Sequence, residues 1–142
     1  MLFDGANGGD VTALTGGWNY AGHSWASGGS FKCDTELGIA WAEYMGSGTS
    51  KKSWETWTKD TLDFSGFTTL KANITRVNTT GTAGLGVEVS DSLVAKTDIT
   101  SPGIVSVSID TISSGQPELY FTQPGGYAYV NSYIYADKVW LE

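Results

Sequence analysis

Aromatic side chains are the residues of this sequence best suited to a chemical role, and that role is ligand binding. They make up 13% of the chain, with six tryptophans and seven tyrosines. A flat aromatic face suits a pyranose ring, because the C–H groups of a sugar are slightly positive against the negative ring face. On an unbulged strand, four tyrosines of one parity would all lie on the same face of a sheet. These are Tyr127, Tyr129, Tyr133 and Tyr135.

Four phenols on one face predict either a binding platform or a protein interface. The alternative is a solvated sheet face, in which tyrosines serve only their β propensity. The amides of Gln123 and Asn131 lie close in sequence and can hydrogen-bond to sugar hydroxyls. Trp18 and Trp25 form a candidate second patch, because they fall in a glycine-rich region with no defined core phase. A large aromatic can equally belong to a core, which the phase of Trp41 favours.

Catalytic chemistry has weak support in the sequence. Glycoside hydrolysis needs two positioned carboxylates, and nothing in the sequence pairs the scattered glutamates. His23 is the sole histidine, and no nucleophile elbow or metal-ligand spacing accompanies it. We therefore expect a protein that is not an enzyme. The glutamates considered are Glu36, Glu43, Glu55, Glu88 and Glu118.

Cofactors are not expected either. A structural calcium is a weak alternative, because Asp4, Asp10 and Asp137 would converge if the two ends of the chain pair, but no calcium-loop spacing supports it. The single cysteine, Cys33, cannot form an intrachain disulfide, and we expect it to be a small buried residue rather than a nucleophile.

Composition and charge limit the classes of partner that this protein is expected to bind. The 142 residues are 40% hydrophobic and only 16% charged, which suits one folded domain over residues 1–142. The net charge of −7 would be repelled by a phosphate backbone and by an anionic membrane. Nucleic acid and membranes are therefore poor candidates, whereas neutral sugars and proteins are open.

The aromatic residues must be positioned by strands. In residues 69–75 the side chains of Leu70, Ala72 and Ile74 alternate with polar ones, which predicts a strand with one buried face. Several similar short segments separated by turn residues predict an all-β, antiparallel sandwich. We expect a long connection over residues 91–102 and a turn over residues 114–117. One shared core is expected for Leu70, Ala72, Ile74, Leu85, Val87, Val89, Val105, Val107, Ile109, Leu119 and Phe121.

The phrase Leu62-Asp63-Phe64-Ser65-Gly66-Phe67, followed by an alternating strand, resembles jelly-roll β-sandwich modules. These include carbohydrate-binding modules and jelly-roll domains of phage tail and bacterial surface proteins. The start Leu2-Phe3-Asp4-Gly5, with the later Thr15-Gly16-Gly17-Trp18, is similar to domains of tail and minor structural proteins of phages of gut Firmicutes, and of surface proteins of their hosts. The resemblance implies a single jelly-roll domain that is one module of a larger protein, at a cell or virion surface. It carries no ligand residue over to a fixed position in this chain.

Together these observations favour a non-catalytic module that binds a glycan or a host surface polysaccharide. The alternative is a structural or assembly domain, with the tyrosine face packed on a neighbouring domain or on a second copy of the chain. A glycoside hydrolase is the least favoured of the three.

Overall fold

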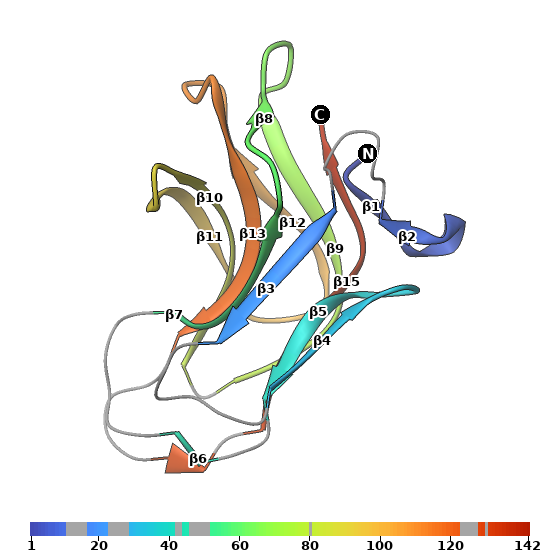
Figure 1. Cartoon of the computed structure of the whole chain (residues 1–142), viewed down its shortest axis with the longest axis vertical. Coiled ribbons are helices and arrows are strands. Elements are labelled where there is room, and N and C mark those ends of the chain that lie inside the picture. Colours follow the sequence, from blue (N-terminus) through green and yellow to red (C-terminus); the bar gives the residue numbers. More distant parts are fainter. Residues whose placement is uncertain are drawn as a thin grey trace.

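The protein is a β-sandwich of two antiparallel sheets in the computed structural model, which confirms the expected all-β class and is compatible with a jelly roll (Figure 1). The structure describes residues 1–10, 17–22, 29–41, 44–45, 52–79, 81–122, 128–129 and 131–142. Among these residues the one helix is a short 3-10 turn, η1 (Gly5–Asn7), which the Asp4 side chain caps at the Ala6 amide.

Seven strands form the larger sheet in the described part of the chain. β15 is its central strand: it pairs with β9 on one side and with β5 and β1 on the other. The first and last strands therefore lie side by side, as expected of a jelly roll (Figure 1). The strands are β12 (Gly103–Ser108), β9 (Thr69–Asn78), β15 (Ser132–Leu141), β1 (Phe3–Asp4), β2 (Gly9–Asp10), β5 (Leu37–Trp41) and β4 (Gly29–Cys33).

Six strands form the second sheet, counted over the same residues. They are β11 (Ser92–Ile99), β10 (Thr82–Val89), β13 (Ser114–Thr122), β7 (Lys52–Thr58) and β3 (Trp18–Gly22), with β8 (Leu62–Asp63) paired to the start of β13. A separate two-stranded ladder joins β6 (Tyr44–Met45) to β14 (Ala128–Tyr129).

The core between the two sheets confirms the predicted alternation. Nine of the eleven predicted core residues are buried, and Val89 and Val105 are partly buried against the same cluster. Trp41 also belongs to this core, as its phase predicts. The apolar face of each strand thus turns toward the other sheet, and the opposite face is left for other functions.

Residues 62–67, the phrase that resembles jelly-roll modules, form a tight turn before β9. The Asp63 carboxylate accepts hydrogen bonds from the Ser65 backbone amide at 2.9 Å and from its hydroxyl at 2.6 Å. Gly66 has a φ of 84°, a left-handed conformation that a residue without Cβ adopts at little cost. The motif therefore fixes a tight turn, and its consequence is structural.

Two segments differ from the sequence-based prediction. Residues 91–102, expected as a connection, contain β11, which pairs with β10 through a tight turn at Ser90 and Asp91, with φ values of 50° and 64°. Neither residue is the glycine that usually marks such a hairpin. Residues 114–117, expected as a turn, begin β13 instead, and Pro117 is accommodated opposite Val87.

Candidate ligand-binding surfaces

The predicted tyrosine row does not lie on one strand. Tyr129 belongs to β14, which pairs with β6 in the separate ladder, whereas Tyr133 and Tyr135 belong to β15 in the larger sheet. Parity holds only along one uninterrupted strand, so it does not carry over from Tyr129 to Tyr133 and Tyr135. Tyr127 lies outside the described residues, as do the side chain of Tyr129 and the whole of Trp25 and Gln123.

Two irregularities in the pairing of β15 with β9 add Trp140 to the face that carries Tyr133 and Tyr135. The register with β9 shifts on either side of Ala136, so that Asp137 and, on β9, Thr75 are extra residues. Ile134 and Ala136 face the core before this point, and Val139 faces it afterwards. Trp140 therefore shares the outer face with Tyr133 and Tyr135, although its parity is opposite.

Arg76 lies across the tyrosine end of this face. Its guanidinium carbon is 3.9 Å from the centre of the Tyr135 ring and 6.0 Å from that of Tyr133. The guanidinium also pairs with the Glu36 carboxylate at 3.1 Å. Tyr135 is consequently only 7% exposed, whereas Tyr133 remains partly open. The accessible surface here comprises Tyr133 and the exposed guanidinium rather than two free rings.

Glu36 anchors this cation–aromatic group. Burial works against its charge, but hydrogen bonds from Thr75, Arg76 and Lys32 outweigh burial and hold the pKa of the Glu36 carboxyl below its usual value. The carboxylate is therefore ionised at neutral pH and keeps Arg76 over Tyr135. Glu36 had been considered only as a scattered carboxylate, and its role here is to position Arg76.

Trp140 occupies the other end of the outer face, between two lysines. The Lys138 ammonium lies 5.4 Å from the centre of the indole ring. Lys71, opposite Trp140 on β9, pairs with the Glu142 carboxylate at 2.7 Å, and the indole N–H donates to the same carboxylate at 3.3 Å. The tryptophan is thus partly exposed, held by its N–H, and surrounded by groups that can hydrogen-bond a ligand.

Trp18 and Asn131, which were also predicted to bind a ligand, lie away from this aromatic face or make other contacts. Trp18 is a core residue, 9% exposed, and its indole N–H donates to the Leu2 carbonyl at 3.2 Å. Its ring is therefore closed to a ligand, because β3 places it on the inner face rather than in a loop. Asn131 is exposed, and its backbone carbonyl accepts a hydrogen bond from Asn78 at 2.6 Å.

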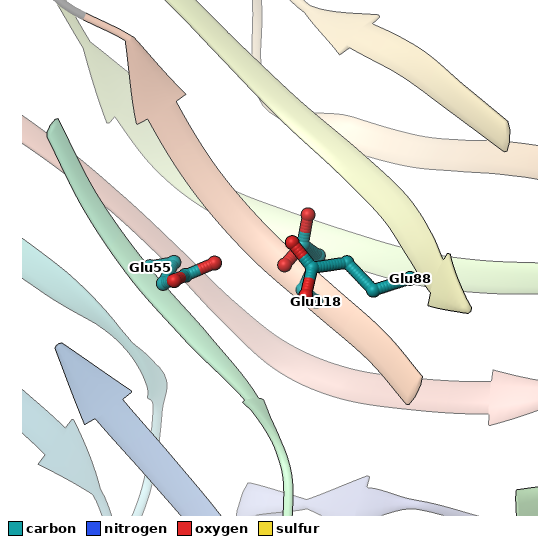
Figure 2. A group of neighbouring side chains, drawn as sticks. All are labelled: Glu55, Glu88 and Glu118. Carbon is teal, nitrogen blue, oxygen red and sulfur yellow. The ribbon is translucent and has the colours of Figure 1, made fainter. Parts of the chain in front are cut away.

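The outer face of the six-stranded sheet carries an acidic cluster that the sequence did not reveal. Glu55, Glu88 and Glu118 stand on β7, β10 and β13, and their carboxylate oxygens come within 4.8 Å of one another (Figure 2). Each also makes another interaction within the fold. Nothing in the sequence pairs these three glutamates, and they meet because strand pairing brings distant segments together.

Tyr120 lies beside this cluster and is almost fully buried, but it is outside the main core. A Cβ at Gly84 would lie 2.5 Å from the tyrosine oxygen, so only glycine admits the ring there. The hydroxyl has no hydrogen-bond partner among the described residues. Burial, then the charges of Glu118 and Asp98, raise the pKa of Tyr120 to about 12, so it remains a neutral phenol.

Accessibility decides what the acidic cluster can do. Carboxylates within this distance are typical of glycoside hydrolases and of calcium sites. Glu118 has no exposed surface, however, and a general acid or nucleophile must touch its substrate. Glu118 is therefore closed to a substrate, whereas Glu55 and Glu88 are partly exposed.

The other residues considered for chemistry have structural surroundings. Asp4 caps η1, and the Asp137 carboxylate accepts a hydrogen bond from Asn73 at 2.9 Å. Among the described residues, Asp4, Asp10 and Asp137 do not form a group with metal-binding spacing. Burial, helped by Asp10 and Asp34, raises the pKa of the Cys33 thiol to about 11, which disfavours the nucleophilic thiolate.

Comparison of the sequence with models of protein families finds no match, and comparison with curated proteins finds none either. No helix in the described part of the chain is long and apolar enough to cross a membrane. The function must therefore be argued from the surfaces themselves.

Proposed function

We propose that the protein is a non-catalytic carbohydrate-binding module whose ligand lies along the outer face of β15. The observation that carries this proposal is the irregularity at Asp137, which aligns Trp140 with Tyr133 on one accessible face. Aromatic rings supply the stacking surface that a sugar needs. At about 3.3 Å per residue, the strand separates these two rings by roughly 20 Å, so the face suits an extended oligosaccharide.

Polar groups flank the aromatic residues on both sides. Lys138 and Lys71 lie beside Trp140, and the exposed edge of Arg76 lies beside Tyr133. Ligand sites typically combine an aromatic surface with a small number of well-placed hydrogen-bond donors and acceptors. The resemblance of residues 62–67 to jelly-roll modules is the reason for proposing, further, a place on a phage tail or bacterial surface protein.

A glycan array tests this function directly. We expect the wild-type protein to retain a defined subset of glycans and Trp140→Ala to lose it. Val94→Ala is a matched control, because Val94 is an exposed apolar side chain on β11 of the other sheet, away from the proposed ligand path. Absence of binding by the wild-type protein at high concentration would contradict the proposal, as would equal binding by Trp140→Ala.

An assembly domain is the second candidate, and exposed Ile104 favours it. Ile104 is 65% exposed on the outer face of β12, opposite Asn73. One exposed apolar side chain is ordinary on a monomer, but Ile104 lies in line with Asn73 and Lys138 on the same outer face as Trp140, and together they give a partner a wider surface. A concentration series in light scattering separates the two functions. Association that Ile104→Glu abolishes would favour assembly, whereas a monomer at all concentrations would count against self-assembly.

A further inference from the structure

The Glu142 carboxylate lies between two donors at the Trp140 end of the outer face. It pairs with the Lys71 ammonium at 2.7 Å and accepts a hydrogen bond from the Trp140 indole N–H at 3.3 Å. Lys71 and Trp140 stand opposite each other on β9 and β15, so the pairing of these two strands fixes the two donors side by side (Figure 1). The outer face of the larger sheet thus holds a position where two donors converge on one carboxylate.

A ligand carboxylate can take the place of the Glu142 side chain. The Glu142 backbone is held in the sheet, because its N–H donates to Thr69 and its carbonyl accepts from Thr68 and Thr69. Its side chain, however, is 60% exposed, whereas the Lys71 side chain is only 26% exposed. Rotation of one exposed side chain into solvent therefore opens the position without moving either strand. It leaves a largely covered ammonium that attracts another anion.

Lys138 adds a second cation beside the same indole. Its exposed ammonium lies 5.4 Å from the centre of the Trp140 ring and makes no ion pair with the described residues. Asp4, opposite Lys138 on β1, caps η1. Asp137 accepts a hydrogen bond from Asn73. The indole is thus flanked by two ammonium groups, and only one of them has an anionic partner among the described residues.

The local charge on this face differs from the charge of the whole chain. The net charge is −7, but three of the acidic residues, Glu55, Glu88 and Glu118, gather on the outer face of the other sheet. The two sheets of a sandwich lie about 10 Å apart, and charges are screened over roughly 8 Å at physiological salt. An anion beside the indole therefore interacts mainly with Lys71 and Lys138.

We propose that the ligand of the β15 face is an acidic saccharide, with a uronate carboxylate held by Lys71 and the Trp140 N–H in place of Glu142. This inference rests on the proposed carbohydrate-binding function and specifies the class of sugar. A hydrogen bond between charged partners is roughly twice as strong as a neutral one, so the position favours a carboxylate over a hydroxyl. The half-exposed guanidinium of Arg76 lies near Tyr133, where it meets a second acidic unit of an extended chain.

Isothermal titration with acidic hexasaccharides and with their methyl esters tests this class of ligand. The acids are hexamers of α-1,4-linked galacturonate, of β-1,4-linked mannuronate and of hyaluronan, and each methyl ester is the same chain without charge. We expect the wild-type protein to bind at least one acid and to bind its ester at least about tenfold more weakly. This preference should shrink as the salt concentration rises, because salt screens exposed charges.

Two substitutions with opposite effects locate the preference. Lys71→Gln removes the ammonium and should abolish the preference for the acid over its ester. Glu142→Gln removes the competing carboxylate, so it should tighten binding of the acid severalfold and leave the ester unchanged. Because Glu142 is exposed, this variant keeps the test valid even if Lys71→Gln folds poorly. Lys96→Gln and Asp98→Asn make the same changes in net charge on β11 of the other sheet, and neither should alter the preference.

The outcomes separate this inference from the proposed function. Equal binding of acid and ester by the wild type, with both lost in Trp140→Ala, would overturn the acidic class and leave β15 as the ligand face. The inference would also fall if Lys71→Gln and Lys96→Gln reduced the preference equally, or if Glu142→Gln bound the acid no more tightly. Acid binding at wild-type strength by Trp140→Ala would contradict the proposed function as well. Failure of the wild type to bind any of the three acids would overturn the acidic class, even if neutral glycans bind on the array.

Discussion

The outer faces of the two sheets carry similar residue types but differ in access. On the larger sheet, Trp140 and Tyr133 are partly open and polar groups surround them. On the smaller sheet, Tyr120 and Glu118 are closed, and the carboxylates face one another (Figure 2). Aromatic and acidic residues on an outer face are therefore insufficient to define a binding site. On the smaller sheet the neighbours Glu55, Glu88 and Trp57 are partly exposed as well. Exposure therefore separates single rings, such as Trp140, which can contact a ligand, from Tyr120, which stabilises the sheet.

The largest effect in this comparison is expected from Tyr120→Ala. Removal of a buried ring should lower the free energy of unfolding by about 3–5 kcal/mol, and saccharide binding should persist at temperatures where the variant remains folded. Tyr120→Phe is the matched control. Because the hydroxyl is buried without a described partner, its loss should leave stability unchanged or raise it slightly. Chemical denaturation measures both variants, and an equal loss from the two would show that the hydroxyl, not the ring, is stabilising.

Glu36→Gln should have an intermediate effect that depends on pH. The folded protein holds the pKa of Glu36 below its ordinary value of 4.5, so ionisation of this group stabilises the fold above that pH. The stabilisation is lost as the pH falls below 4.5 toward the folded pKa. We expect the variant to be less stable by about 1–3 kcal/mol at pH 7, with a difference that shrinks in acid. Denaturation at several pH values tests this, and a constant difference would contradict the role assigned to the carboxylate.

Trp140→Ala should have the smallest effect on stability and the clearest effect on binding. The residue lies on the outer face and is partly exposed, so its loss should change the free energy of unfolding by less than about 1 kcal/mol. Thermal melts and titrations on the same samples would show a nearly unchanged midpoint with lost affinity. A large fall in stability would instead identify Trp140 as a packing residue.

Local patterns predicted the fold well because alternation reports which face of a strand is buried. The strand around Ile74 and the shared core follow from that rule. The same rule misplaced β11, whose core-facing positions include Thr97 and Ala95 and therefore give little apolar contrast. Its tight turn at Ser90 and Asp91 lacks the usual glycine.

The candidate surfaces were less predictable because they depend on register. The alternation of Val139, Trp140 and Leu141 indicates an outward Trp140. It does not indicate that a single extra residue at Asp137 reverses the parity of β15 and puts Trp140 on the face of Tyr133. The clustering of Glu55, Glu88 and Glu118 likewise depends on which strands pair.

Chemical-shift mapping on isotope-labelled protein tests whether a glycan binds along the outer face of β15. A glycan identified on the array would be titrated into the protein while the backbone amides and the indole N–H groups are followed. We expect the largest changes on β15 around Tyr133 and Trp140 and on the facing part of β9, with the Trp140 indole signal among the most shifted. Changes concentrated instead around Glu118 and Tyr120, with Trp140 unaffected, would contradict it.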